Sequence, residues 1–423
     1  MREKLRVDIA GHAITDLVSE FGTPLYVYDE APIRRRVEQL ACFDTIRYAQ
    51  KACSHLAILA MMRQAGVLVD AVSAGELLRA IEVGYTASGD PPPIVYTADI
   101  FDRPALDLCR DLGIHVNAGS PDMIQQWGEL APGQDMTLRI NPGFGHGHSQ
   151  KTNTGGEHSK HGIWLEQLED CLVSMDQYGM AVTGVHMHIG SGSDWEHLSQ
   201  VCQAMESAVE TVGRTVRTIS TGGGLSIPYH PDDAEFELEP FYERWSATQN
   251  RLQDRLGHSL RMEVEPGRFL VAESGYLIAE IRAVKQMGGN LFYLVDAGFN
   301  DLARPILYGA YHPMSVAPAN GRPAERRVHE VVVGGPLCES GDIFTQTDGG
   351  FVQPRPLPTA GVGDFLVLES AGAYGQVMAS NYNSKPLAAA VLLRDQQRHL
   401  IRRRQTLADM WSDEQLLPSE TRD

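Results

Sequence analysis

Short runs of β-branched and other apolar residues alternate with longer amphipathic stretches through the first two thirds of the chain. Eight such runs occur, at residues 45–50, 67–73, 94–98, 114–118, 136–141, 182–189, 216–220 and 261–265. The stretches between them, for example 55–64, 75–83, 104–112 and 198–212, carry apolar residues at helical spacing. Eight successive β/α units are typical of an α/β chain that closes into a TIM-type (β/α)8 barrel, and we predict that barrel here.

A doubly wound open sheet is the alternative α/β architecture, and it requires a Gly-x-Gly-x-x-Gly turn after the first strand. The first strand here ends in Gln50-Lys51 without such glycines. A glycine cluster occurs at residues 143–147, but its spacing differs and no helical pattern follows it directly. We interpret residues 143–162 as a long loop, and a mobile segment and a plain surface insertion are equally good explanations of it.

After residue 270 the pattern changes to strands without helices between them, at residues 276–284, 291–296, 328–333 and 365–369. Such a series is typical of a separate β domain, and residues 24–28 are expected to pair with it. We predict a barrel over residues 31–270 and a β-sandwich or β-barrel domain formed by residues 1–30 and 271–423. The basic run at 402–404 is expected to be solvated surface.

Charge and cysteine content exclude several classes of partner. The 423 residues contain 36 Lys plus Arg and 54 Asp plus Glu, and the net charge of −18 repels nucleic acids and anionic membranes. No apolar stretch suits a signal peptide or a membrane span, so we expect a cytoplasmic protein. The six cysteines show no paired spacing, which predicts neither disulfides nor a metal site, and most are expected to be buried thiols.

Residues with chemical capacity recur where four of the predicted strands end. Lys51 follows the first, His188 lies in the sixth, residues 222–224 are glycines after the seventh, and Glu265 ends the eighth with Arg268 close behind. Each feature alone is more often structural, but in a TIM-type barrel these ends share one rim, where active sites lie. Glycines with an arginine suit a phosphate, and a desolvated lysine forms a Schiff base. Together with a carboxylate for a ring nitrogen, they indicate pyridoxal 5′-phosphate.

Longer motifs reveal a similarity to a known family. They lie at residues 24–28, 48–52, 186–191, 222–225, 265–268, 335–340, 371–374 and 381–386. In these motifs the sequence resembles the diaminopimelate decarboxylase family, in the fold-type III, alanine racemase-like group of pyridoxal-phosphate enzymes. The resemblance implies decarboxylation of meso-2,6-diaminopimelate to L-lysine and CO2, the last step of lysine biosynthesis. Two departures, Cys53 for an Asn and His161 for a Phe, change no residue expected to do chemistry.

The resemblance also implies roles for individual residues. Lys51 would hold the cofactor covalently, His188 would stack on its ring and Glu265 would pair with the ring nitrogen. The phosphate side would be contacted by Ser191, Gly222, Gly223, Gly224, Gly267, Arg268 and Tyr374. The substrate would be bound by Arg268, Arg304, Tyr308, Glu339 and Tyr374. Cys338 would donate a proton and, with Glu339, would come from the second subunit of a homodimer.

The charges of these residues agree with that activity. A carboxylate at Glu265 keeps a pyridine nitrogen protonated, which favours decarboxylation, whereas racemases of the same group carry an arginine there. Arg304 and Glu339 supply the two charges that a distal carboxylate and ammonium need. Spacing alone also allows Arg304 to form a weak surface ion pair. The turn-forming flanks of Cys338 predict an accessible thiol.

Two other functions stay open from the sequence. A related decarboxylase for arginine, ornithine or carboxynorspermidine uses the same scaffold, and a non-catalytic cofactor carrier is built from the barrel alone. The β domain with Cys338 and Tyr374 disfavours the carrier, because a carrier needs no proton donor.

Overall fold

The computed structural model describes residues 5–144, 155–188, 195–322 and 325–417. It divides into two compact units. The barrel unit comprises Ile33–Pro228 and Asp232–Val271, and the β unit comprises Met1–Pro32, Tyr229–Pro231 and Ala272–Asp423. Each unit has a buried apolar interior of its own.

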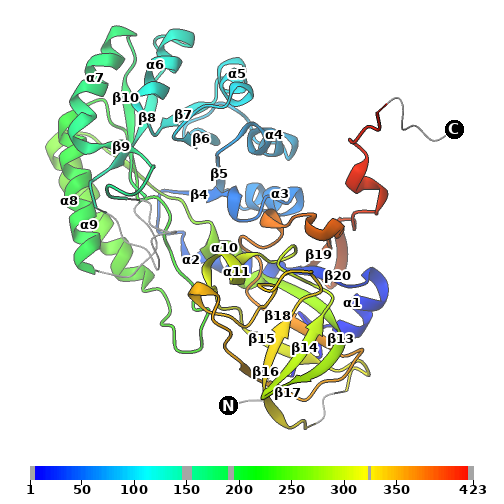
Figure 1. The fold of residues 1–423 in the computed structure, drawn as a ribbon. Coiled ribbons are helices and arrows are strands. Elements are labelled where there is room, and N and C mark those ends of the chain that lie inside the picture. Colours follow the sequence, from blue (N-terminus) through cyan, green and yellow to red (C-terminus); the bar gives the residue numbers. More distant parts are fainter. Residues whose placement is uncertain (1–4, 145–154, 189–194, 323–324, 418–423) are drawn as a thin grey trace. The chain divides into compact units, whose positions relative to one another are not determined.

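Eight parallel strands form the wall of the barrel unit (Figure 1). They are β4 (Thr45–Ala49), β5 (Leu68–Ala71), β6 (Ile94–Ala98), β7 (His115–Ala118), β8 (Met136–Asn141), β10 (Val182–His186), β11 (Thr218–Ser220) and β12 (Arg261–Val264). They pair in chain order, and β12 pairs with β4 through Glu263↔Thr45 and Val264↔Ile46 to close the ring. The predicted TIM-type barrel is confirmed, and the short β9 (Ile163–Trp164) pairs with β8 outside the ring.

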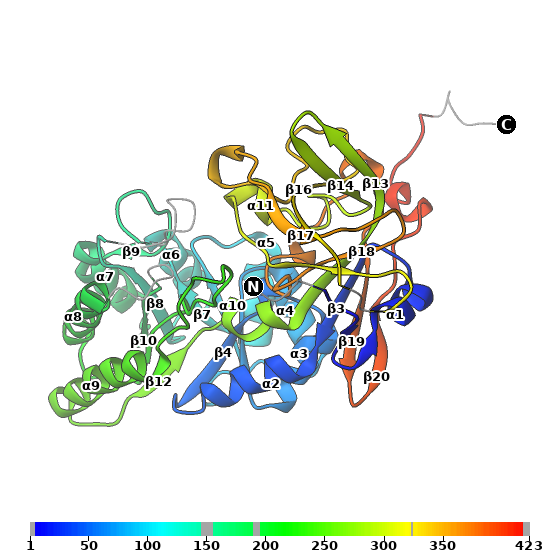
Figure 2. The same ribbon diagram turned by 90° about the horizontal axis from the view of Figure 1, so that it is seen from below.

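Helices alternate with these strands and lie outside the ring (Figure 1). They are α2 (Glu30–Gln39), α3 (Leu56–Gln64), α4 (Ala74–Glu82), α5 (Arg103–Leu112), α6 (Pro121–Leu130), α7 (Leu168–Gln177), α8 (Trp195–Val212), α9 (Leu238–Leu256) and the one-turn α10 (Arg268–Val271). Side-chain caps start three of them, because Ser73, Asp102 and Ser120 each accept a backbone N–H three residues on. The two longest, α8 and α9, lie side by side in both views (Figure 2), and Arg251 bonds Glu206 between them at 2.6 Å.

The β unit is built around the long strand β13 (Gly275–Met287), which pairs with three neighbours: β3 (Leu25–Asp29), β14 (Asn290–Val295) and β18 (Phe365–Leu368). The sheet continues through β15 (Met314–Ala317), β16 (Val328–Gly334), β17 (Arg355–Pro358), β19 (Ala389–Arg394) and β20 (Gln397–Arg402). The hairpin β1 (Asp8–Ile9) and β2 (His12–Ala13) leads into α1 (Ile14–Phe21), whose apolar face joins the core, and α11 (Arg304–Tyr308) follows β14. The predicted pairing of the N-terminal segment with the later strands is confirmed by β3.

Two expectations for the C-terminal part need correction. Strands β15, β17, β19 and β20 were not expected, because they carry weaker alternation than the strands found from the sequence. The run 402–404 is not simply solvated: Arg404 is half-buried and donates to the carbonyl oxygens of Phe21 at 3.3 Å and Pro24 at 2.8 Å. Only Arg403 of the three is exposed, because the chain leaving β20 continues beside the α1–β3 connection.

The cysteines are all free thiols, and four of them are buried while Cys42 and Cys338 are exposed. Half of the loop predicted over residues 143–162 falls in residues 145–154, outside the described residues. Within the described residues, no helix is both long and apolar enough to cross a membrane.

Candidate active site

The turn that carries Lys51 lies against the turn that follows Glu265. Lys51 is exposed in a 3-10 turn, Gln50–Ala52, directly after β4. The backbone N–H of Ala49 donates to Pro266 O at 3.1 Å, which joins the ends of β4 and β12. A Cβ at Gly267 would come within 3.2 Å of the Ala52 Cβ, so the turns touch where only glycine fits comfortably.

The glycine triplet after β11 is pressed against two neighbouring strand ends. Gly222 has φ of +65°, and a Cβ there would lie 2.4 Å from Met187 O and 2.7 Å from the His188 Cβ. A Cβ at Gly223 would lie 2.6 Å from Glu265 O. Gly224 also has a positive φ, of +92°. Side chains are excluded here, and the backbone N–H groups of Gly222 and Gly223 donate to Ser220 Oγ at 3.2 Å and to His188 Nδ1 at 2.8 Å.

His188 is held in one protonation state by this contact. The Gly223 N–H donates to His188 Nδ1 at 2.8 Å, so that nitrogen carries a lone pair. Burial, followed by the charges of Arg139 and Lys51, lowers the pKa of His188 well below its usual value. The ring is therefore neutral, with its hydrogen on Nε2. The predicted phosphate contact Ser191 lies outside the described residues.

Glu265 is held as a carboxylate at the end of β12. Its Oε2 lies 2.8 Å from His186 Nε2, and its Oε1 accepts the Ser220 hydroxyl at 2.8 Å. Burial alone would raise the pKa of Glu265, but His186, the Ser220 hydroxyl and the charge of Arg47 hold it below its usual value. The carboxylate thus stays ionised at neutral pH, as a partner of a protonated ring nitrogen must.

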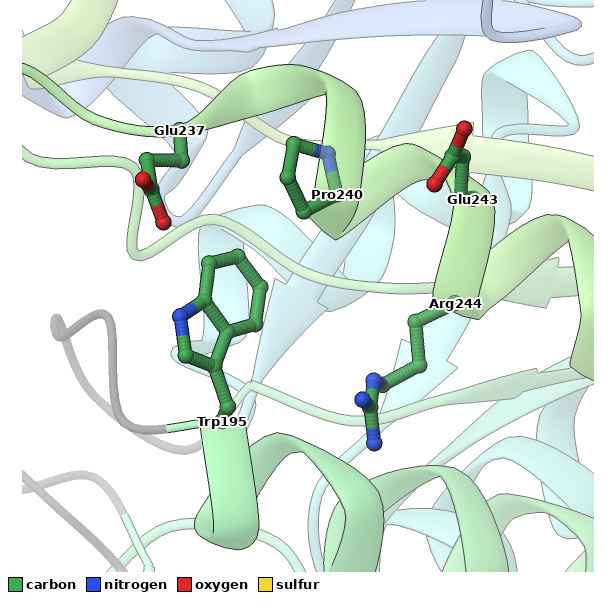
Figure 3. Close-up of a pocket in the computed structure, with 5 residues that line it drawn as sticks. All are labelled: Trp195, Glu237, Pro240, Glu243 and Arg244. Carbon is green, nitrogen blue, oxygen red and sulfur yellow. The ribbon is translucent and has the colours of Figure 1, made fainter.

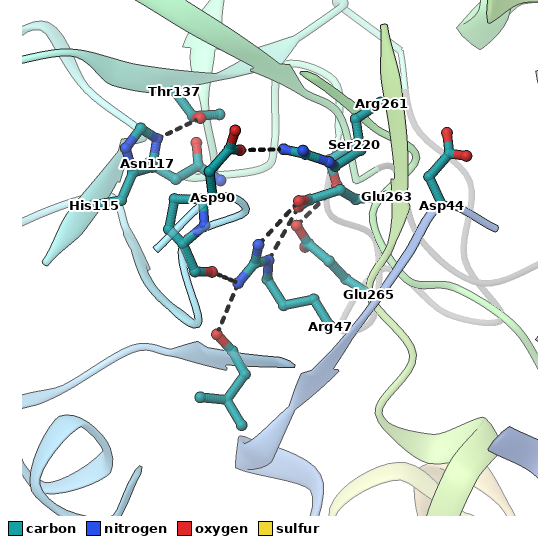
Figure 4. Close-up of polar contacts among 12 residues, drawn as sticks. Asp44, Arg47, Asp90, His115, Asn117, Thr137, Ser220, Arg261, Glu263 and Glu265 are labelled. Atoms are coloured by element: carbon teal, nitrogen blue, oxygen red, sulfur yellow. Dashed lines mark hydrogen bonds and ion pairs between the residues drawn. The ribbon is translucent and has the colours of Figure 1, made fainter. Parts of the chain in front are cut away.

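A second buried ion pair lies two residues earlier on the same strand (Figure 4). Glu263 accepts both Nε and Nη2 of Arg47 at 3.0 Å, and Arg47 also donates to Val69 O and Pro92 O. Although burial lowers the pKa of Arg47, Glu263 together with Glu265 and Asp70 raises it above its usual value. Because Val69 and Pro92 lie at the beginnings of strands or before them, this pair stabilises the end of the barrel opposite the glycine triplet.

Two further charged residues of the barrel interior were missed by the sequence analysis. Arg139 on β8 is buried, and burial lowers the pKa of its guanidinium. Asp70 on β5 has a buried Oδ1 without a partner among the described residues, and burial and then Glu265 raise its pKa. A charged residue inside an apolar barrel strand was the signal available in the sequence. Such buried polar atoms are satisfied when a ligand supplies the partner.

These features fit pyridoxal phosphate. The ionised Glu265 suits a ring nitrogen, and Arg139 offers buried donors to an oxygen anion. Lys51 is close enough for its charge to lower the pKa of His188. The structure thus brings together five of the predicted cofactor positions in the barrel unit: Lys51, His188, Gly222, Gly223 and Glu265, with the Gly267-Arg268 turn adjacent.

The β unit holds the other predicted residues. Arg304 begins α11 and is buried, with its guanidinium 4.7 Å from the centre of the Tyr229 ring, so the surface ion-pair interpretation is wrong. Tyr308 ends the same helix and is partly buried, and Tyr374 has an unusual positive φ of 54°.

Cys338 lies in the turn after β16 and is exposed, as predicted, and so is Glu339. The Cys338 N–H donates to Asn383 Oδ1 at 2.7 Å. The Asp342 carboxylate accepts the N–H groups of Leu337 and Phe299, each at 2.8 Å. The backbone on both sides of the thiol is therefore fixed while the side chain stays accessible.

A cavity of about 460 Å³ opens at the start of α8 and α9 (Figure 3). Its lining consists of Trp195, Glu237, Pro240, Glu243 and Arg244. Among the residues that the structure describes, none of those predicted from the sequence lines this cavity.

Comparison with known proteins adds independent findings. A family model described as the pyridoxal binding domain of pyridoxal-dependent decarboxylases matches residues 30–272. The diaminopimelate decarboxylase of Streptomyces coelicolor is 53% identical, covering 98% of this chain and 94% of its own length. The diaminopimelate decarboxylase of Escherichia coli K12 is 51% identical, and the match covers 95% of this chain and 96% of that protein. A crystal structure of diaminopimelate decarboxylase at 51% identity superposes with a TM-score of 0.92, covering 95% and 96%. The crystal structure of the Helicobacter pylori diaminopimelate decarboxylase complexed with L-lysine superposes with a TM-score of 0.84 at 29% identity. The match covers 94% of this chain and 98% of that one.

Proposed function

This chain belongs to the diaminopimelate decarboxylase family of pyridoxal-dependent decarboxylases, and from that premise we propose how its residues divide the reaction. The chain is a carboxy-lyase that uses pyridoxal phosphate to convert meso-2,6-diaminopimelate to L-lysine and CO2. The same relatives favour this activity over decarboxylation of arginine, ornithine or carboxynorspermidine.

The ionised Glu265 is the observation that carries the division of roles. When bound, pyridoxal phosphate accepts the electron pair that departing CO2 leaves on Cα. Glu265 would keep a proton on the ring nitrogen, because an adjacent negative charge raises the pKa of the cationic form. His186 and Ser220 position that carboxylate through the 2.8 Å contacts. Lys51 would hold the cofactor covalently and the neutral His188 would stack on its ring.

The remaining cofactor contacts would lie around the phosphate. We assign them to Ser191, Gly222, Gly223, Gly224, Gly267, Arg268 and Tyr374. Gly224 would contribute a backbone N–H donor, and Arg268 would contribute a charge-assisted one.

Substrate recognition is assigned mainly to the β unit. Arg304 would bind the distal carboxylate and Glu339 the distal ammonium, with Arg268, Tyr308 and Tyr374 beside them. Cys338 would then give its proton to Cα of the product.

We further propose that the active protein is a cytoplasmic homodimer. The exposure of Cys338 and Glu339 in a single chain supports their use by a second subunit. The free cysteines suit a reducing compartment. We propose two functional domains. Residues 31–270 would bind the cofactor, and residues 1–30 together with 271–423 would carry the proton donor.

Assay of CO2 and lysine release from meso-2,6-diaminopimelate, beside arginine, ornithine and carboxynorspermidine, tests the activity. Glu265→Gln should lower kcat at least ~100-fold while the protein still binds cofactor, since the ring nitrogen loses its charged partner. Glu263→Gln is the matched control, because it weakens a buried ion pair on the same strand without touching His186. Equal loss of kcat in the two variants would reduce Glu265 to a structural residue.

Lys51→Ala tests the covalent attachment. The chain has only six lysines, and this variant should lose the borohydride-reducible linkage to the cofactor. Retention of that linkage would move the role to another lysine.

Subunit complementation tests the shared site. Inactive Lys51→Ala chains mixed with inactive Cys338→Ala chains should regain part of the activity, because a mixed dimer contains one intact set of residues. No recovery despite proven subunit exchange would place both residues in one chain's site.

A further inference from the structure

A fully buried histidine of the β unit contacts the arginine assigned to the distal carboxylate. His312 lies directly before β15, and none of its surface is exposed. Its Nε2 lies 3.0 Å from Arg304 Nη1, and its Nδ1 lies 3.0 Å from the carbonyl oxygen of Glu369. The histidine thus stands between a buried cation and a fixed backbone acceptor.

The two partners determine which nitrogen of His312 carries hydrogen. A backbone carbonyl only accepts, so Nδ1 must donate to Glu369 O. An arginine only donates, so Nε2 must offer its lone pair to Arg304. A protonated ring would set two donors against each other at 3.0 Å. His312 is therefore neutral, with its hydrogen on Nδ1.

The backbone around His312 is fixed as firmly as its ring. The Glu369 N–H donates to Pro313 O at 2.8 Å. Together with the contact between His312 Nδ1 and Glu369 O, this bond joins the two segments at two adjacent points. Arg355 donates to His312 O at 2.7 Å. The Glu369 side chain accepts the Ser315 hydroxyl at 2.8 Å. The imidazole therefore has little freedom to tilt.

Arg304 meets a second fixed group at right angles to the first. Its guanidinium lies 4.7 Å from the centre of the Tyr229 ring. The Tyr229 and His312 rings meet edge to face, 5.5 Å apart at 76°. One ring face and one lone pair therefore determine the plane and the direction of the guanidinium. A guanidinium oriented in advance loses less conformational entropy when it binds a carboxylate.

We propose that His312 is a positioning residue that sets substrate specificity by aiming Arg304 at the distal carboxylate. This inference rests on the proposed function, in which Arg304 binds that carboxylate. Because His312 acts through Arg304, it selects for ligands that retain the carboxylate and leaves the binding of other diamines unchanged.

Two competitive ligands separate this role from a general structural one. L-Lysine retains the carboxylate that was distal in diaminopimelate, whereas 1,5-diaminopentane has none. His312→Asn keeps a donor near Nδ1 but lacks the acceptor at Nε2. It should raise the inhibition constant of L-lysine and the KM of meso-2,6-diaminopimelate at least ~10-fold, as expected for a lost hydrogen bond to a charged group. The inhibition constant of 1,5-diaminopentane and the absorbance of the bound cofactor should not change.

His312→Gln supplies the rescue, because its amide reaches the Nε2 position and offers an oxygen to Arg304. It should restore L-lysine binding to within ~3-fold of the unmodified protein. His399→Asn, on the exposed face of β20, is the matched control and should change nothing. In a protein that already carries Arg304→Ala, His312→Asn should not change the inhibition constant of L-lysine any further.

Several outcomes would overturn the inference. Equally weakened binding of L-lysine and of 1,5-diaminopentane would mean that His312 has a structural role. Failure of His312→Gln to restore L-lysine binding would mean the same. If His312→Asn does not fold, the result for His312→Gln alone decides. If Arg304→Ala weakens the binding of L-lysine and His312→Asn does not, the inference about His312 fails and the proposed role of Arg304 stands. If Arg304→Ala leaves L-lysine binding unchanged, the proposed role of Arg304 fails first.

Discussion

The two units stabilise their buried charges in different ways. In the barrel unit two buried carboxylates meet a cationic or titratable side chain: Glu263 meets Arg47, and Glu265 meets His186. Beside the functional loops of the β unit, buried carboxylates meet backbone N–H groups instead. Asp342 accepts two such groups, from Phe299 and Leu337, and Asp301 accepts one from Gly298.

The difference follows from what each unit has to present. Side chains in the barrel interior hold fixed charge where a charged cofactor binds, and opposite charges tune one another's pKa. Carboxylates in the β unit fix the course of loops, because an N–H donor belongs to a particular backbone position. Asp342 thereby fixes the chain immediately before Cys338. The barrel unit thus sets electrostatics and the β unit sets geometry.

Breaking the ion pair in the barrel should have the largest effect on stability. Glu263→Ala leaves Arg47 buried without its partner, which is expected to lower the free energy of unfolding by about 3–5 kcal/mol. Chemical denaturation checks this value. The double variant Glu263→Met with Arg47→Met removes both charges and should recover most of the loss, and a double variant as unstable as the single one would contradict the pairing argument.

Titration should reveal a buried acid with a raised pKa in each unit. Burial raises the pKa of Glu76 in the barrel unit and of Asp301 in the β unit, each to about 7. Folding then favours their protonated forms, so stability is fully present below their ordinary values near 4 and is lost as pH rises to 7. Glu76 should account for about 3 kcal/mol of that loss and Asp301 for about 4 kcal/mol. Unfolding measured at pH 5 and pH 8 should show a smaller difference for Glu76→Gln and for Asp301→Asn than for the unmodified protein. An unchanged difference in both would contradict the two raised values.

A smaller effect is expected where a carboxylate meets only backbone. Asp342→Asn turns one acceptor into a donor that faces an N–H, and should cost about 2 kcal/mol of stability. If the loop argument is right, kcat should fall while the absorbance of the bound cofactor stays normal, because Cys338 is displaced and the barrel unit is not changed. Stopped-flow or steady-state assays with a cofactor spectrum check both parts. A change in the spectrum with kcat intact would reverse the assignment of tasks to the units.

The smallest effect separates two neighbouring arginines of the same run. Arg404→Ala removes two bonds to backbone carbonyls and should cost about 1 kcal/mol. Arg403→Ala removes an exposed contact with Asp409, and no change in the thermal midpoint is expected. Equal midpoints for the two variants would show that the backbone contacts of Arg404 contribute nothing.

The barrel could be predicted from the sequence because each strand is an apolar run followed by a helical pattern. Tertiary contacts rarely override such long periodic patterns. The sequence predicted Lys51, Glu265 and the glycines 222–224 because they follow strands. It did not predict Arg139 and Asp70 as site residues, since one charge inside a strand gives no hint of which face it occupies. Strand β20 was missed for the opposite reason: its residues are polar, and pairing with β19 rather than burial makes them a strand.

The junction between β4 and β12 also has a consequence for how the protein is made. Lys51 and Glu265 belong to the first and last strands of the ring, and they become neighbours only when β12 pairs with β4. A ribosome releasing the chain from its N-terminus exposes Lys51 long before Glu265 exists. Contacts so distant in sequence form late, because closing the intervening loop costs entropy. If Lys51 holds the cofactor as proposed, cofactor capture would mark completion of the ring, and a chain that stops before its eighth strand would carry Lys51 without Glu265.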